Sequence, residues 1–261
     1  RDHPSDGAML GMRITAPKQY TVVANGARTQ VVDKPDGTRS TQFEALTPMP
    51  AYDFHFVAYD GYRESDARSS GGIPVRTYVY EAHDAAGHRM MDDVPKAMDF
   101  YTTAFGAYRW GTLSLQEEPI FGGGMEHAGC VSMDETLFRS PVSSRHTAFH
   151  ELAHHWSGNL VRIKTWNDFW LSEGFTEYLT RRFVWDHDGE SEGRALWRST
   201  LQNGLGAERQ NDHALRPAGD DIDVLQIFDD ISYQKGAYVL RTLEHEIGAE
   251  EKSVRIAVEQ R

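Results

Sequence analysis

The stretch HELAHHW at residues 150–156, together with LSEGFTEY at residues 171–178, indicates the chemistry of this chain. Residues four apart lie on one face of an α-helix, so His150 and His154 can converge on one ion. Glu151 lies about 100° further round such a helix, from where it can approach a metal-bound water without being a ligand. The pattern therefore predicts a helix that carries two nitrogen ligands and one spare carboxylate.

A third ligand is spaced for the same ion. Glu173 follows His154 by nineteen residues and lies on a second predicted helix. Two imidazoles and one carboxylate leave the fourth position of a tetrahedral zinc open, as hydrolytic zinc sites do. One turn further, Glu177 is either an acceptor that orients a zinc-bound histidine or an exposed helix acid, and both interpretations stay open. The sequence therefore predicts one Zn²⁺ per chain and a hydrolase.

Two neighbouring histidines offer alternative pairs. His155 lies five residues after His150, which places it about 140° away from the common face at 3.6 residues per turn. His146 lies four residues before His150, but Thr147 would then stand where the base belongs. No third ligand is obviously spaced for that pair. The pair of His150 and His154 is therefore the favoured interpretation.

Composition narrows the class of protein. The chain has 261 residues, 39% of them hydrophobic, which is typical of a globular protein. Its 39 acidic and 27 basic residues give a net charge of -12, which argues against nucleic acid or an anionic membrane as a partner. The chain contains no run of about 18 apolar residues, so the sequence predicts no membrane span. The single cysteine, Cys130, excludes an intrachain disulfide and a cysteine-rich zinc site.

The first part of the chain reads as β structure. Lys34-Pro35-Asp36-Gly37 predicts a hairpin turn, because Pro, Asp and Gly each favour one position of a tight turn. Short apolar or β-branched runs predict strands around it, at residues 9–14, 20–23, 31–32, 40–46 and 52–59. The polar, glycine-containing residues 65–72 read as a linker. We therefore predict a β domain over residues 1–70 and a catalytic domain over residues 71–261.

The second part becomes increasingly helical. Ser143 or Ser144 is a good N-cap for the metal helix, which we expect to end near Gly158. Strands are predicted at residues 75–81 and 112–116, and further helices at residues 94–105, 169–182, 192–201 and 233–247. The predicted fold class is α+β, an all-β segment followed by a mixed α/β domain.

Two further segments are open to a functional interpretation. The run GGGMEH at residues 122–127 is either a flexible loop or a backbone that approaches a ligand closely, as an edge strand that binds a peptide must. The run YQKG at residues 233–236 places a tyrosine at a helix start. Such a tyrosine is usually a packing residue, but a phenol can also stabilise the oxyanion that forms on an attacked carbonyl.

Taken together, HELAHHW, SEGFTEY, GGMEH and YQKGA resemble the aminopeptidase N-like family of zinc metallopeptidases, the gluzincins. Upstream, TAPKQYTVVANG and TPMPAYDFHFVA resemble the family's amino-terminal β domain, so the resemblance covers nearly the whole chain. It implies the carboxy-terminal part of that all-β domain, followed by a thermolysin-like catalytic domain. The chain starts at Arg1 and ends at Arg261 within an expected helix, which we interpret as a piece of a longer protein.

The resemblance also implies roles at the metal. His150, His154 and Glu173 match the family's zinc ligands. Glu151 matches the general base, which takes a proton from the attacking water and passes it to the leaving amine. Tyr233 matches the donor that stabilises the transition state.

A second set of roles concerns the substrate. Gly123, Gly124, Met125 and Glu126 match the strand that binds the peptide, with Glu126 in the place that holds the free α-amino group. The family commonly has GAMEN or GGMEN, so His127 stands where an asparagine is usual. This departure concerns the substrate specificity of the enzyme more than its activity.

The function implied is a zinc aminopeptidase, which removes amino-terminal residues from peptides with a free amino terminus. A thermolysin-like endopeptidase and a non-catalytic zinc-binding scaffold of the same fold are the alternatives. Epoxide hydrolysis, as in leukotriene hydrolases of the family, has no distinct residue signature here. Nothing in the sequence indicates an oligomeric state or a compartment.

Overall fold

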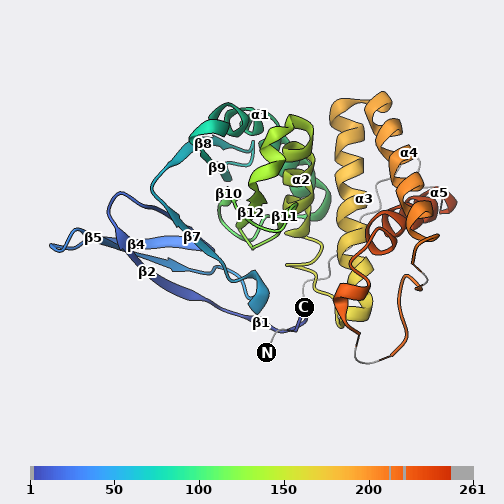
Figure 1. The fold of residues 1–261 in the computed structure, drawn as a ribbon, viewed down its shortest axis with the longest axis horizontal. Coiled ribbons are helices and arrows are strands. Elements are labelled where there is room, and N and C mark those ends of the chain that lie inside the picture. The colour runs from blue at the N-terminus through green and yellow to red at the C-terminus, as the bar shows by residue number, and fades with distance from the viewer. Residues whose placement is uncertain (1–2, 212, 220–221, 248–261) are drawn as a thin grey trace. The chain divides into compact units, whose positions relative to one another are not determined.

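The computed structural model describes residues 3–211, 213–219 and 222–247. The chain divides into two compact units, Arg1–His155 and Trp156–Arg261. Strands occupy the first unit and long helices the second, with two further helices in the first (Figure 1). The predicted α+β fold, a β region followed by an increasingly helical part, is confirmed. The domain boundary after residue 70 stays a prediction.

Antiparallel strands form the amino-terminal part of the first unit. The predicted hairpin turn is present, because Lys34 donates from its backbone N–H to the Thr38 carbonyl at 2.8 Å. Gly37 adopts φ 87° within that turn, a conformation that favours glycine. One sheet has the order β2-β5-β4, and two further pairs are β3 with β7 and β1 with β6. Their bounds are β1(Gly7–Ala8), β2(Gly11–Pro17), β3(Thr21–Ala24), β4(Ala27–Asp33), β5(Thr38–Glu44), β6(Met49–Pro50) and β7(Phe56–Tyr59).

A five-stranded mixed sheet follows in the same unit. Its order is β11-β12-β10-β9-β8, with β9, β10 and β12 parallel and the two edge strands antiparallel to their neighbours. Every residue of β10 and β12 is buried, as the inner strands of a sheet covered on both faces are. The bounds are β8(Tyr62–Arg68), β9(Pro74–Tyr80), β10(Leu113–Glu118), β11(Gly124–Met125) and β12(Cys130–Asp134).

The predicted linker over residues 65–72 is wrong. Residues up to Arg68 belong to β8, which pairs with β9 from Tyr62↔Tyr80 to Arg68↔Pro74. The polar sequence has a physical reason: β8 is an edge strand that leaves most of its side chains exposed. A half-solvated edge strand and a linker have similar compositions, so composition alone did not separate them.

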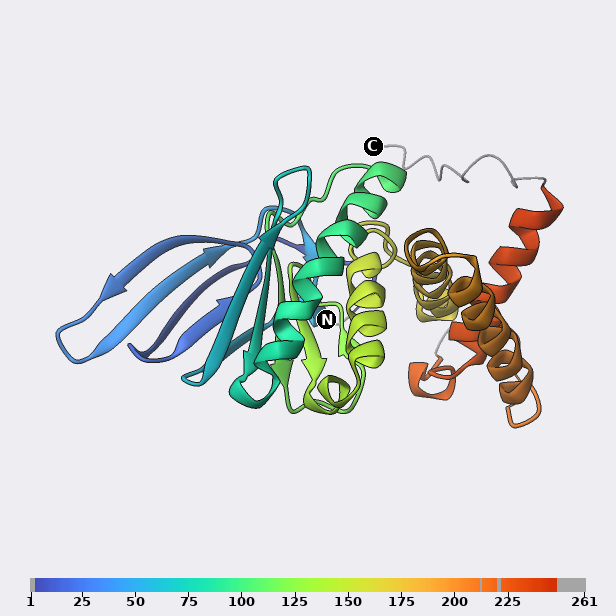
Figure 2. The same cartoon turned by 90° about the horizontal axis from the view of Figure 1, so that it is seen from above.

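Two helices pack side by side on this sheet (Figure 2). The first, α1(Asp84–Phe105), begins ten residues before the helix that was predicted over residues 94–105. Pro95 lies inside it, and a proline is more common in the first turn of a helix, which explains the misplaced start. The second, α2(Pro141–His154), has Ser140 as its N-cap, not Ser143 or Ser144, and ends at His154 rather than near Gly158.

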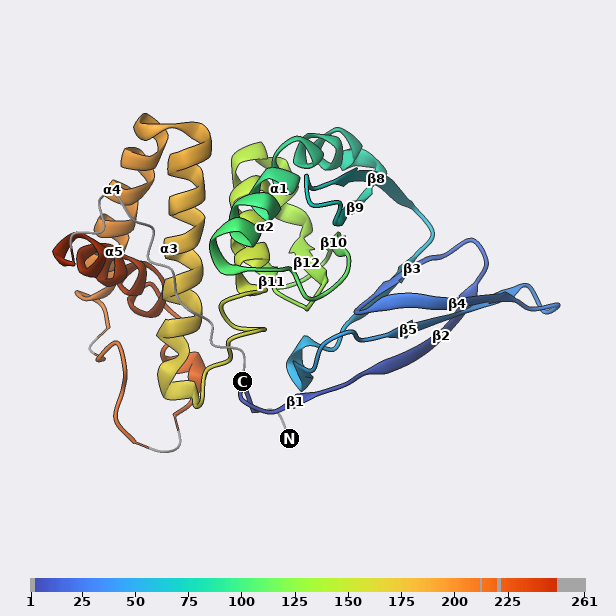
Figure 3. The ribbon, with the colours of Figure 1, turned by 180° about the vertical axis from the view of Figure 1, so that it is seen from behind.

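The second unit consists of helices. The predicted helices at residues 169–182 and 192–201 exist but are longer, α3(Phe169–Asp188) and α4(Glu190–Ala207). They lie side by side and meet at Gly189, and α5(Gly236–Glu246) packs against both (Figure 3). The predicted helix over residues 233–247 begins as a π-helical segment, η6(Ile231–Lys235), and continues as α5. The expected helical chain end lies in residues 248–261, outside the described residues.

Short 3-10 turns connect these elements: η1(Ala51–Asp53), η2(Glu81–His83), η3(Glu135–Arg139), η4(Trp166–Asp168) and η5(Val224–Gln226). Across residues 3–211, 213–219 and 222–247, no helix combines the length and the apolar character that crossing a bilayer requires.

Candidate active site

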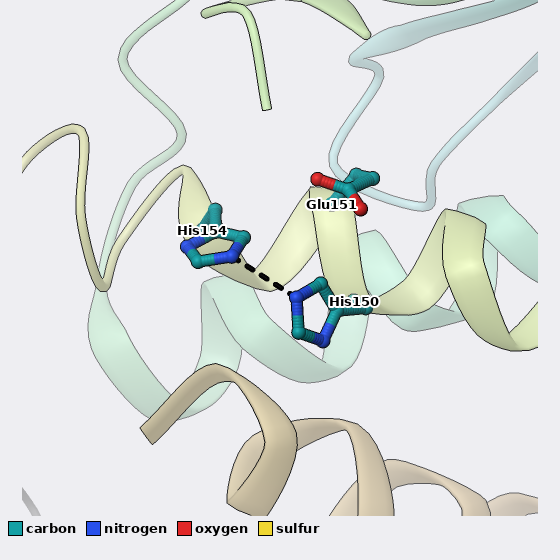
Figure 4. A group of neighbouring side chains, drawn as sticks. All are labelled: His150, Glu151 and His154. Atoms are coloured by element: carbon teal, nitrogen blue, oxygen red, sulfur yellow. Dashed lines mark hydrogen bonds between the residues drawn. The ribbon is translucent and has the colours of Figure 1, made fainter. Parts of the chain in front are cut away.

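Helix α2 brings three of the predicted residues together. His150, Glu151 and His154 place their possible ligand atoms within 4.8 Å of one another (Figure 4). The two imidazole rings meet edge-on, at an interplanar angle of 77°, with their Nε2 atoms 3.1 Å apart. Glu151 comes from the neighbouring position on the helix, so its carboxylate stands beside the two rings rather than between them.

The helix is held by the apolar residues between these positions. Phe149, Leu152 and Ala153 are fully buried, so α2 turns its apolar side into the unit. Tyr101 of α1 donates its hydroxyl to the Phe149 carbonyl at 3.3 Å, which ties the two helices together next to the site. Glu151 is only 4% exposed, so its carboxylate lies in a poorly hydrated place. There a carboxylate is a stronger electrostatic partner than it would be in water.

The donor set fits zinc. Two nitrogen ligands at about 2.0–2.1 Å from a tetrahedral ion would lie roughly 3.3–3.4 Å apart. The 3.1 Å separation of the His150 and His154 Nε2 atoms is close to that value. Neutral imidazole and carboxylate are ordinary zinc ligands, and the helix already presents both nitrogens on one side. His150 and His154 would therefore hold the ion in this unit.

His155 has a different role. Its Nε2 accepts a hydrogen bond from the Gly129 backbone N–H at 2.8 Å, and its Nδ1 lies 3.2 Å from the Leu152 carbonyl. Burial lowers the pKa of His155 to about 3, so the ring is neutral and Nδ1–H donates to Leu152. Both nitrogens are occupied. His155 therefore anchors the loop around Gly129 to the end of α2, and is not a metal ligand.

The glycine-rich segment forms an edge strand beside the base. β11 lies at the edge of the five-stranded sheet, and Gly124 pairs with Met133 of β12. A Cβ atom on Gly124 would come within 2.6 Å of the Glu151 carboxylate oxygen Oε1, so the carboxylate lies directly on the strand backbone. Gly123 adopts φ 72° at the turn into the strand. An edge strand and a carboxylate thus meet at one place in the first unit.

A polar cluster holds the residues after this strand. Glu126 is 9% exposed, and the next residue, His127, places Nδ1 3.0 Å from the hydroxyl of Ser132. Ser132 donates to Glu118 Oε1 at 2.8 Å, and His55 stacks on His127 with ring centroids 4.1 Å apart. Burial, and then the proximity of His55, lowers the pKa of His127 to about 3. No sequence motif pointed to His55, Ser132 or Glu118, because these residues come from separate strands and loops.

Glu173 and Tyr233 lie in the second unit. Glu173 is a 5% exposed residue of α3, and Tyr233 lies in η6. The Tyr233 ring contacts the rings of Phe169 and Phe228, at centroid distances of 5.9 and 5.4 Å. These two residues belong to a different compact unit from α2, and it remains a prediction that they complete the site there.

Two residues beside Glu173 and Tyr233 were not assigned from the sequence. Arg181 of α3 is 6% exposed, and it binds both Glu177 and the side chain of Gln234. Gln234 was visible within the YQKG run, whereas nothing in the sequence marked Arg181 as buried. The suggested role of Glu177 in orienting a zinc-bound histidine stays a prediction.

Comparison with known proteins agrees with this geometry. The family model for the Peptidase family M1 domain matches residues 89–258. The chain belongs to peptidase family M1. The resemblance to aminopeptidase N-like zinc metallopeptidases is thereby confirmed, and membership of this family implies zinc.

Individual relatives match almost the whole chain. Leucine aminopeptidase 2 of Vanderwaltozyma polyspora is 31% identical over 95% of the chain, which covers 38% of that protein. Endoplasmic reticulum aminopeptidase 2 of Homo sapiens is 28% identical over 95% of the chain and 27% of its own length. The chain therefore spans well under half the length of these relatives.

A solved structure has the same fold. The crystal structure of an M1 zinc metallopeptidase from Deinococcus radiodurans, a mutant bound to a Tyr-Ser-Ala substrate, matches with a TM-score of 0.78 and 25% identity. The match covers 95% of this chain and 55% of that one. The M1 fold therefore extends through both the β region and the helical part.

Proposed function

We propose that the protein containing this chain is a zinc aminopeptidase, which removes amino-terminal residues from peptides with a free amino group. The observation that carries the proposal is the meeting of two imidazoles, one carboxylate and the edge strand β11 in one place. A pair of histidine ligands on its own would suit any zinc hydrolase. An edge strand beside the base suits a peptide substrate, because a peptide can add to a sheet edge through its backbone.

The proposed metal site contains one Zn²⁺, held by His150, His154 and Glu173. When bound, zinc polarises the scissile carbonyl and lowers the pKa of water toward neutrality. Glu151 accepts a proton from the attacking water and returns it to the leaving amine. Tyr233 donates its phenol proton in a hydrogen bond to the oxyanion that develops on the carbonyl.

The proposed substrate site is the segment Gly123, Gly124, Met125 and Glu126. The backbone of β11 aligns the peptide, and the Glu126 carboxylate binds its α-ammonium group. Glu126 is 9% exposed, and a charge pair in such a place is weakly screened by water. Anchoring the ammonium decides which peptide bond reaches the base, which favours an exopeptidase over a thermolysin-like endopeptidase.

A panel of aminoacyl fluorogenic amides, assayed on the full-length protein with and without a chelator, tests the proposal. We expect cleavage that the chelator abolishes and Zn²⁺ restores. Robust cleavage of amino-blocked peptides, without cleavage of free ones, would show an endopeptidase. Stoichiometric zinc without any hydrolysis would show a non-catalytic scaffold.

Substitution of the base gives the sharpest test. Glu151→Gln keeps the size of the side chain and removes its basicity, so we expect kcat to fall by on the order of 10² to 10⁴. Glu192→Gln on the exposed face of α4 is the matched control. Wild-type turnover in Glu151→Gln would rule out the proposed mechanism.

A second substitution tests the substrate site. Glu126→Ala should abolish the preference for a free amino terminus.

A further inference from the structure

A buried arginine joins three elements of the second unit. Arg181 of α3 forms an ion pair with Glu177 one turn earlier, and both side chains are largely buried. Its Nε donates to the hydroxyl of Thr200 on α4 at 2.5 Å, and its Nη2 donates to Gln234 Oε1 of η6 at 2.7 Å. Burial lowers the pKa of Arg181 to about 9, which leaves it cationic at neutral pH. A buried charge with so many partners fixes the groups around it.

The Gln234 side chain matches the ion pair at both ends. Its carbonyl oxygen accepts from Arg181, and its Nε2 donates to Glu177 Oε1 at 3.2 Å. An amide has one acceptor and one donor end, so only one orientation satisfies both partners. The pair of Arg181 and Glu177 therefore holds Gln234 in a defined position and orientation.

Gln234 lies within the π-helical turn η6, which also contains Tyr233. In η6 the backbone N–H of Lys235 donates to the Asp230 carbonyl at 2.9 Å, five residues back, and that of Gly236 donates to Ile231. Such π-helical insertions are rare and occur frequently at functional sites. The surroundings must stabilise this geometry, since an ordinary α-helical turn would be the default.

The backbone of η6 and of Gly236 after it packs directly against the backbones of α3 and α4. A Cβ atom on Gly174 would lie 3.0 Å from the carbonyl carbon of Gly236, and one on Gly204 would lie 3.1 Å from the Lys235 nitrogen. Gly174 is the residue after Glu173. The segment that contains Tyr233 thus rests on the backbone next to the predicted third zinc ligand.

The residues on α3 are spaced to work together. Glu173, Glu177 and Arg181 follow one another at intervals of four, so they form one stripe along the helix. The two later members bind Gln234, and the first is the predicted ligand. One face of one helix therefore combines a metal ligand with the groups that hold η6.

We propose that Arg181 and Glu177 are positioning residues, which act through Gln234 to hold the Tyr233 phenol in place relative to Glu173. The inference rests on the proposed function, in which Tyr233 stabilises the transition state and Glu173 binds zinc. Neither Arg181 nor Gln234 contacts the substrate in this proposal. Their effect is geometric, and misplacing a catalytic group by about 1 Å can cost on the order of 10²-fold in rate.

A double-mutant cycle tests this inference. Gln234→Met keeps the length of the side chain and removes both polar ends. In the full-length enzyme we expect it to lower kcat by about tenfold to a hundredfold, with KM changed by less than about twofold. Introduced into a Tyr233→Phe background, it should lower kcat no further, because the group it positions is already absent. Gln226→Met, at an exposed position of the same unit, is the matched control.

The outcomes separate this inference from the proposed function. If Tyr233→Phe leaves kcat unchanged, the proposed role of Tyr233 fails. If Tyr233→Phe lowers kcat but Gln234→Met costs the same factor in both backgrounds, the positioning role fails and the catalytic one stands. An unchanged kcat in Gln234→Met also overturns the positioning role.

A second variant guards against misfolding. Replacing Arg181 and Glu177 together with Met removes the buried ion pair without leaving an unpaired charge, a change that proteins often tolerate. We expect this double variant to reproduce the loss of kcat, with its zinc content retained and with Arg198→Met of α4 as the exposed control. Full kcat in the folded, zinc-loaded double variant would overturn the inference.

Discussion

The partners of each histidine near the end of α2 decide its chemistry. His150 and His154 direct their Nε2 atoms at each other, so both can bind one ion. In His155, the next residue, both ring nitrogens instead form hydrogen bonds, with the backbone of Gly129 and of Leu152. The hydrogen bonds that each ring already makes thus decide between a metal ligand and a structural anchor.

His127 should make stability depend on pH. Its pKa is about 3 in the folded protein against an ordinary value of 6.5, so between these values the unfolded chain binds a proton that the folded chain does not. The free energy of unfolding should therefore fall as pH decreases from 6.5 toward 3, by up to about 1.4 kcal/mol per pH unit. Above pH 6.5 His127 is neutral in both the folded and the unfolded chain, so the free energy of unfolding no longer depends on its titration.

Urea unfolding between pH 4.5 and 7.5 measures the effect. His127→Asn, which introduces the residue usual in the family, should weaken this dependence, because asparagine does not titrate. The contribution of His155 remains in both proteins and cancels in the comparison. Identical slopes for the two proteins would contradict the assignment.

At the scale of elements, close helix packing defines the second unit. Gly174 of α3 faces the backbone of Gly236 where α5 begins, and this contact leaves no room for a side chain. The π-helical turn η6 must also lie close to α3, since its residue Gln234 accepts a hydrogen bond from Arg181 of that helix. Sequence periodicity predicted these helices but not their lengths or the π insertion, because both depend on tertiary contacts.

Gly174→Ala should destabilise the second unit. Its Cβ would lie 3.0 Å from a backbone atom, which cannot move aside as a flexible side chain can, so we expect a loss of about 1–3 kcal/mol. Gly206→Ala on α4 is the matched control, because no atom lies within 4 Å of the Cβ position there. That variant should gain up to about 1 kcal/mol from helix propensity. Thermal and urea unfolding compare the two, and equal stabilities would show that the contact at Gly174 relaxes freely.

Errors in the predicted elements have local causes. Helix α1 begins well before the start that was predicted for it, and the polar edge strand β8 suggested a linker. In both cases packing against other parts of the unit overrides the local signal. The strand β12, every residue of which is buried, was missed because it is short and lacks alternation.

At the scale of the whole molecule, the proposed zinc site draws on both units. His150 and His154 belong to the first, and Glu173 belongs to the second. Because an ion bound only by the folded state stabilises that state, zinc should raise the melting temperature. At a free zinc concentration of 1,000 times Kd, the free energy of unfolding rises by about 4 kcal/mol.

Thermal unfolding with zinc and with a chelator tests this coupling. We expect the chelator to lower Tm in the wild type and Glu173→Gln to reduce the zinc-dependent difference, because it weakens one of three ligands. Metal analysis of the purified wild type should give one zinc per chain. An unchanged zinc effect in Glu173→Gln would remove Glu173 from the ligand set.

By itself, the sequence determined the class of chemistry. Helical periodicity places His150 and His154 on one face, because it is a property of residues close together in the chain. The resemblance of four motifs, each a short run of residues, led to the M1 family. Only the tertiary structure decided that His155 is an anchor, that β11 lies on Glu151, and that Gln234 docks on Arg181. Each of these depends on partners from distant segments and on burial, which exist only once the chain has folded.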